Sequence, residues 1–93
     1  MHSNRVSRLR FVRASSTDQD RGLIGWISCV YADSLVLAGI AVRRMRDDRI
    51  SLSFPTRTDA TGRRHSLVRP IDDDARQEIE AAVFKLLKIE EAS

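Results

Sequence analysis

The segment from residue 23 to residue 42 constrains the fold most, because it is almost continuously apolar and is broken only at Ala32-Asp33-Ser34. Two apolar runs of this length around a short polar turn predict a β-hairpin. Both runs are apolar at odd and even positions, and a strand that is apolar on both faces needs cover on both faces. Strict alternation gives Leu23, Ile27 and Cys29 opposite Ile24, Trp26 and Val30 in the first strand, and Leu35 and Leu37 opposite Val36, Ile40 and Val42 in the second.

The flanking segments predict further strands joined by polar turns. Their apolar residues alternate with arginine or serine, which is typical of strands with one solvent-exposed face. The clusters of Asp, Ser, Thr and Gly between them are typical of turns and loops. The expected strands are residues 5–13, 50–54 and 63–69, and the expected loops and turns are residues 15–20, 46–49 and 56–62.

A single helix is predicted over roughly residues 73–88. It begins after Pro70 at three aspartates, which cap the first turn and place negative charge where the helix dipole is positive. Its apolar residues recur on one side of the helix and form a single stripe of Ala75, Ile79, Ala82, Val83 and Leu86. The predicted fold class is therefore α+β: a small antiparallel meander of about five strands with a C-terminal amphipathic helix.

The 93 residues are expected to form one domain, with strands over roughly residues 5–70. A chain this short hides only about 60% of its unfolded surface when it folds, so its core is small. One amphipathic helix covers one face of a sheet, whereas the predicted hairpin is apolar on both. A second copy is the simplest cover for the other face, and a homodimer is predicted.

Composition excludes several classes of protein. No run approaches the roughly 20 apolar residues of a membrane span, and residues 1–13 carry four arginines without an apolar secretory core. We therefore expect a cytoplasmic protein with no membrane partner. The single cysteine cannot form an internal disulfide, and two histidines do not complete a zinc site. No metal, cofactor or small-molecule substrate is expected.

Residues suited to catalysis are scarce. His65 lies in an arginine-rich segment, with no carboxylate in its local sequence to orient it as a base. Cys29 lies in mid-strand and is interpreted as a packing residue rather than a nucleophile. The aspartates at 72–74 are interpreted as helix caps, because consecutive residues do not converge on one cation. An enzyme is not expected; a deep cleft around His65 with a carboxylate partner would favour one.

Charge is distributed unevenly along the chain. Residues 1–70 contain thirteen Arg or Lys and six Asp or Glu, a balance of +7. Residues 71–93 contain three and seven, a balance of −4, and the two sums give the total of +3. A basic body with one acidic segment suits a polyanionic partner, and it also describes an ordinary solvated surface.

Two groups of arginines are the candidate binding residues, because a guanidinium group can clamp a phosphate or read a guanine edge with paired hydrogen bonds. The loop arginines frame the polar loop and the strand after it: Arg57, Arg63, Arg64 and Arg69. The strand-end arginines follow the third predicted strand: Arg43, Arg44 and Arg46. Four aromatic residues that could stack on bases are interpreted instead as core or dimer packing, since no aromatic RNA-binding signature surrounds them. They are Phe11, Trp26, Tyr31 and Phe54.

Several short motifs follow one another in order: Phe54-Pro55-Thr56-Arg57, Gly62, Arg69-Pro70-Ile71-Asp72 and Arg76-Gln77-Glu78-Ile79. Together they resemble the SpoVG family of septation proteins (stage V sporulation protein G). Residues 6–10 and 36–42 also resemble the opening and central strands of that family. The loop departs from the family pattern, since one basic residue and a proline are missing before Gly62 and arginine stands where a histidine precedes Pro70.

The resemblance implies a dimeric DNA-binding regulator of gene expression, with RNA as a further ligand. It also implies a link to septum formation in cell division and, in spore formers, to sporulation. By position, Arg57 matches the basic loop residue of the family, so the loop arginines are the leading predicted contacts and the strand-end arginines come second. The alternative is a protein-interaction module that acts on a division or regulatory partner through its apolar sheet or acidic helix, without direct nucleic-acid binding.

Overall fold

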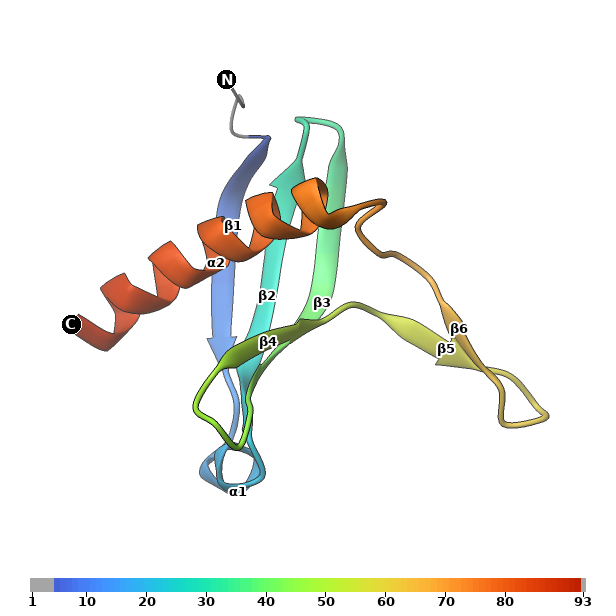
Figure 1. Cartoon of the computed structure of the whole chain (residues 1–93), viewed down its shortest axis with the longest axis horizontal. Helices are drawn as coiled ribbons and strands as arrows, with labels where there is room; N and C mark the ends of the chain where they lie inside the picture. Colours follow the sequence, from blue (N-terminus) through green and yellow to red (C-terminus); the bar gives the residue numbers. More distant parts are fainter. Residues whose placement is uncertain (1–4, 93) are drawn as a thin grey trace.

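The computed structural model describes residues 5–92, with side chains described to residue 88 (Figure 1). It confirms the α+β class: a small antiparallel sheet is followed by one long C-terminal helix. The elements are β1 (Val6–Arg13), α1 (Ser16–Asp20), β2 (Leu23–Tyr31), β3 (Leu35–Arg44), β4 (Ile50–Ser53), β5 (Thr56–Thr58), β6 (Arg64–Ser66) and α2 (Asp73–Ala92).

Four strands form a meander in the order β1-β2-β3-β4, and each neighbouring pair is antiparallel. β5 and β6 form a separate two-stranded sheet, which projects from the body as an arm (Figure 1). The prediction of a polar loop over residues 56–62 was wrong for its first three residues, and the strand predicted at 63–69 is shorter. The threonines at 56 and 58 favour extended backbone, and they pair across the arm with Ser66 and Arg64.

The core lies between the meander and α2, which crosses one face of the sheet (Figure 1). The predicted helix stripe is confirmed, and Leu87 extends it by one more buried residue. The fully buried centre of the core consists of side chains from α2 and from the two middle strands, β2 and β3. The buried core cluster consists of Val6, Ile27, Cys29, Ile40, Val42, Leu52, Ile79, Val83 and Leu87.

The prediction of which side chains share a face of β3 was wrong. Strict alternation placed Ile40 and Val42 opposite Leu37, yet all three belong to the core on the helix side. Gly39 is the cause: its φ is +74°, and the pairing of β2 with β3 shifts register beside it. The extra residue turns the strand over. Val36 therefore remains on the opposite face, where it is 72% exposed.

A second irregularity lies in β2 at Gly25. The register shifts between Leu23 and Gly25, so Ile24 packs against the core and not on the opposite face as alternation predicted. A Cβ atom on Gly25 would overlap the Val12 carbonyl oxygen and the Phe11 ring. β1 and β2 therefore approach more closely here than any other residue allows.

The helix begins as predicted, at an aspartate cap. The Asp72 carboxylate accepts a hydrogen bond from the Ala75 amide at 2.9 Å, and the Asp72 carbonyl accepts one from the Arg76 amide at 3.1 Å. The predicted loop at 15–20 contains the single helical turn α1, which the Ser15 hydroxyl caps by accepting from the Asp18 amide. Short capped turns of this kind satisfy backbone donors without burying apolar surface.

The face of the sheet opposite α2 is uncovered in the single chain. Trp26 pairs with Val12 and Ala41 there, and it is 37% exposed while Val12 is 62% exposed. The other three aromatic residues that were assigned to packing, Phe11, Tyr31 and Phe54, do pack against the core. Among the described residues, neither helix is both long and apolar enough to cross a membrane.

Candidate nucleic-acid interface

Four arginines from four separate parts of the chain line one hollow, where the arm joins the body. They are Arg43 at the end of β3, Arg64 in β6, Arg69 in the connection to α2, and Arg76 in the first turns of α2. The hollow has a volume of about 500 Å³. Its other lining residues are Leu52, Ser53, Phe54, Thr56, Ser66 and Val68. This arginine hollow has no carboxylate among its lining residues.

Strand pairing in the arm orients one of its faces toward the hollow. Thr56 pairs with Ser66 and Thr58 with Arg64, so these four side chains share a face. Three of them, Thr56, Arg64 and Ser66, line the hollow. The arm thus contributes two hydroxyl groups and one guanidinium to the same concave surface.

Arg76 is a further candidate, which sequence reasoning does not reveal because the residue falls within the helix motif of residues 76–79. Its guanidinium carbon lies 5.8 Å from the centre of the Phe54 ring, a distance typical of a cation–π contact. The contact orients the side chain along the Phe54 ring, and both residues line the hollow. A usable signal was its position directly after Ala75, at the start of the helix and close behind Arg69 and Pro70.

The four loop arginines do not converge on one site. Arg64 and Arg69 line the arginine hollow, whereas Arg57 pairs with His65 and so lies on the opposite face of the arm. Arg63 lies beside the turn at the tip, where its amide donates to the Asp59 carboxylate and its carbonyl accepts from the Asp59 amide. The arm therefore presents positive charge on both faces and near its tip.

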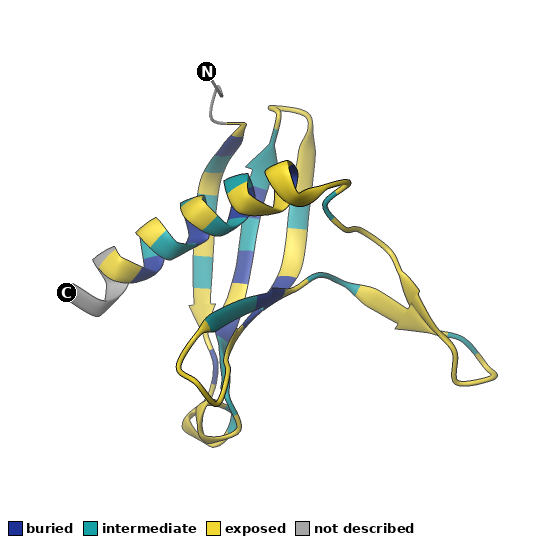
Figure 2. Cartoon of the chain, viewed as in Figure 1, coloured by how far each residue is buried: buried dark blue, intermediate teal, exposed yellow. Residues whose placement is uncertain are grey.

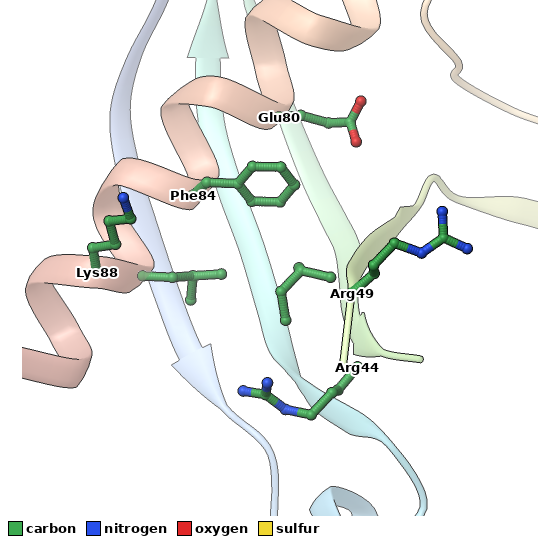
Figure 3. Close-up of a pocket in the computed structure, with 7 residues that line it drawn as sticks. Arg44, Arg49, Glu80, Phe84 and Lys88 are labelled. Atoms are coloured by element: carbon green, nitrogen blue, oxygen red, sulfur yellow. The ribbon is translucent and has the colours of Figure 1, made fainter. Parts of the chain in front are cut away.

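The strand-end arginines are also divided. Arg43 lines the arginine hollow, while Arg46 lies in the exposed turn between β3 and β4. Arg44 lines a different groove between α2 and the β3–β4 end of the sheet, together with Arg49, Glu80 and Lys88 (Figure 3). That groove contains a carboxylate, and Arg49 is already paired with Asp47 at 2.6 Å. It is the weaker candidate for an anion.

The expectation that His65 has no carboxylate partner was wrong. The turn of the arm brings Asp59 back to the histidine, and its Oδ2 lies 2.7 Å from Nε2 of His65. The other oxygen, Oδ1, accepts from the Thr61 amide at 2.9 Å, the Thr61 hydroxyl at 2.6 Å and the Arg63 amide at 3.0 Å. Hydrogen bonds from His65 first, and then from Thr61 and Arg63, lower the pKa of Asp59 to about 2.

The Asp59–His65 pair organises the tip of the arm. The carboxylate satisfies donors from three different residues of the turn, which is the common role of an aspartate in a tight turn. The His65 side chain is half exposed and lines neither the arginine hollow nor the groove of Arg44. Burial raises the pKa of the Cys29 thiol, which keeps the thiol protonated in the core.

A scan against models of known protein families finds no match to this chain, and a search of curated proteins finds no similar protein. The function proposed below therefore rests on the residues of this chain.

Proposed function

We propose that this protein is a cytoplasmic, dimeric nucleic-acid-binding regulator of the SpoVG type, with DNA as its principal ligand and RNA as a further one. Its role would lie in septum formation during cell division and, in a spore former, in sporulation. The observation that carries the proposal is the arginine hollow, which is lined by four arginines and by no carboxylate. The order of the sequence motifs, which resembles that of the SpoVG family, supports the choice of this type of regulator.

A phosphate backbone is the ligand whose chemistry matches this surface best. Guanidinium groups bind phosphate oxygens through paired, charge-assisted hydrogen bonds, and the hydroxyl groups of Ser53, Thr56 and Ser66 supply further donors. Arg76 is positioned in advance by the Phe54 ring, which reduces the rotational freedom lost on binding. Release of condensed counterions from the nucleic acid would add a salt-dependent driving force.

The arm extends this surface beyond the hollow. Arg57 and Arg63 lie outside the hollow but on the same short hairpin, and both are exposed. A nucleic-acid strand seated over Arg64 would meet Arg63 near the tip, and it would contact Arg57 where it wraps onto the opposite face of the arm. We assign the four arginines of the hollow as the central contacts and these two as peripheral contacts.

The test is fluorescence anisotropy of labelled duplex DNA and of single-stranded RNA at two salt concentrations. The variant is Arg64→Ala with Arg69→Ala, which removes two charges from the hollow. The control is Arg8→Ala with Arg21→Ala, which removes two exposed charges outside the hollow. We expect the first variant to bind at least about tenfold more weakly and to lower the salt slope by about 2, and we expect the control to resemble wild type.

A specific observation also favours the protein-interaction alternative: the uncovered sheet face exposes Val12, Trp26 and Val36. In that case wild-type protein would not bind nucleic acid at physiological salt. Equal losses in the two double variants would also contradict the proposed site, since net charge alone would then explain binding. Circular dichroism on each variant would establish that the fold is retained.

The dimer is part of the proposal because the single chain leaves apolar surface uncovered. Eight large apolar side chains are exposed among the described residues, and they include Leu35 at 62% and Ile71 at 92%. Apolar patches of this kind mark interaction sites in soluble proteins. Light scattering at micromolar concentration should give twice the mass of one chain, and a monomer would refute the dimer.

A further inference from the structure

The outer edge of β3 is only half paired. β3 has ten residues, whereas β4 has four and pairs with residues 41–44 alone. Along residues 35–40, no strand within the described part of the chain lies on the outer side of β3. Figure 2 shows most of the upper part of this strand in the colour of exposed residues. Unpaired backbone donors and acceptors along a strand form a template for another strand.

The opposite edge of the sheet is protected against such pairing. β1 carries Arg8, Arg10 and Arg13, and Arg8 has a φ of +51° beside a register shift. Charges and bulges are the usual devices that prevent edge strands from associating. Residues 35–40 of β3 contain no charged side chain, and Val36 is 72% exposed. The two edges of one sheet therefore differ in their readiness to pair.

An apolar hollow of about 220 Å³ lies directly beside the free edge of β3. Leu35, Val68 and Ile71 line it at the surface, and core residues such as Leu37 and Ile79 also line it. A strand that pairs with the free edge places alternate side chains on this side of the sheet. Apolar side chains at those positions would fill the hollow.

We propose that a second copy of the chain pairs its own β3 antiparallel with this edge, across a two-fold axis. The inference rests on the dimer of the proposed function and names the surface that forms it. The reason is self-complementarity: each copy carries an exposed Leu35, a free edge and the apolar hollow that receives Leu35 of the other copy. A two-fold interface requires the same patch on both partners, and here the facing strands have no like charges to repel each other.

The interface borders the proposed nucleic-acid site, because Arg69 lines both the apolar hollow and the arginine hollow. Pairing of the two β3 edges joins two four-stranded sheets into one and places an arginine hollow on each side of the axis. One nucleic-acid molecule would then contact both hollows, so the dimer raises affinity by linking two sites.

The first test compares Leu35→Lys with Val12→Lys by light scattering. Both side chains are 62% exposed, so neither substitution disturbs the core. Lysine at residue 35 places like charges in the proposed interface, whereas residue 12 lies on β1, away from it. We expect Leu35→Lys to be monomeric and Val12→Lys to remain dimeric. A monomeric wild type, or a dimer lost only in Val12→Lys, would overturn the proposal and, in the second case, assign the interface to the uncovered sheet face.

The second test is oxidative cross-linking of single-cysteine variants at residues 35–38, in a background where Cys29 is replaced by alanine. Antiparallel pairing of one strand with itself brings a residue near the axis close to its own copy, so one of these variants should form a covalent dimer much faster than Val12→Cys. Equal rates at all positions would overturn edge pairing. Among residues 35–39, the amides that point away from β2 should also exchange slowly in the dimer and fast in Leu35→Lys.

The two proposals fail in different ways. Leu35→Lys should lose at least about tenfold in DNA affinity, and its salt slope should fall to that of a single hollow without vanishing, since the arginines of each hollow are intact. Arg64→Ala with Arg76→Ala, two residues that line the arginine hollow and not the apolar hollow, should bind DNA at least about tenfold more weakly and remain dimeric. If the wild type is dimeric through β3 yet binds no nucleic acid, the result supports the proposed interface and contradicts the proposed function.

Discussion

The four-stranded body and the β5–β6 arm are stabilised in different ways. The body buries a cluster in which Ile40, Val42 and Val83 are fully inaccessible. In the arm, every residue from 56 to 66 is exposed except Asp59, which is half-buried, and the turn is held by hydrogen bonds to that one carboxylate. The difference indicates that the body supplies most of the free energy of folding. The arm contributes little to it, and its exposed arginines are accessible to a ligand.

The strongest test of this comparison is a cavity in the body. Ile40→Ala should lower the free energy of unfolding by about 2–5 kcal/mol, because a fully buried side chain loses its packing and leaves a void. The control, Val12→Ala, removes a side chain that is 62% exposed and should cost less than about 0.5 kcal/mol. Urea denaturation followed by circular dichroism measures both values. Equal losses would show that the two positions are buried alike in solution.

The helix cap is the next largest effect. Asp72→Ala should reduce the free energy of unfolding by about 1 kcal/mol, because the Ala75 amide loses its acceptor at the start of α2. Asp72→Asn is the matched variant: asparagine caps equally well, so most of the stability should return. If the asparagine variant is as unstable as the alanine variant, the negative charge of Asp72 stabilises the helix start, and its hydrogen bond does not.

The arm should respond locally and not globally. Asp59→Ala removes the acceptor for Thr61, Arg63 and His65, so the amides of Thr61 and Arg63 should exchange with solvent faster. The midpoint of global denaturation should stay unchanged within error, since the turn contributes nothing to the core cluster. Hydrogen exchange measured by nuclear magnetic resonance separates the two readouts. A large shift of the midpoint would mean that arm and body unfold as one unit.

Acid should loosen the same turn. The pKa of Asp59 is lowered to about 2 from its ordinary value of 3.8, so folding of the turn favours the charged carboxylate. Its contribution is complete above about pH 3.8 and is lost as the pH falls through about 2. Titration of the Asp59 carboxyl carbon and of the Thr61 amide should therefore show a midpoint near 2. A midpoint near 3.8 would contradict the hydrogen-bond network.

Local signals in the sequence were sufficient for most of the fold. The turn at Ala32, the aspartate cap of α2 and the apolar stripe of the helix were all predicted, because each depends on neighbours within a few residues. The bulge at Gly39 was not predicted, since alternation assumes a regular pleat and one extra residue reverses the faces beyond it. Three-residue strands such as β5 are too short to show a period.

The sequence predicted that the candidate site consists of arginines, but it did not predict which arginines line it. The interest in arginines came from charge and motif order, and Arg43, Arg64 and Arg69 do line one hollow. Sequence neighbours nevertheless separate: Arg57 lies on the other face of the arm from Arg64, because side chains alternate along a strand. Arg76 joins the hollow from the first turns of α2, shortly after Arg69, and its contact with the ring of Phe54 is the long-range feature that no local pattern contains.

From the sequence we could predict the α+β class, the core hairpin, the capped amphipathic helix and the basic character of residues 1–70. These properties follow from side-chain period, turn chemistry and charge, which are local and additive. The folded chain was needed to show which face each strand residue occupies, which arginines line one hollow, and that Asp59 reaches His65. It also left the outer edge of β3 half paired. Such features depend on register and on contacts between distant segments, where a shift of one residue changes every neighbour.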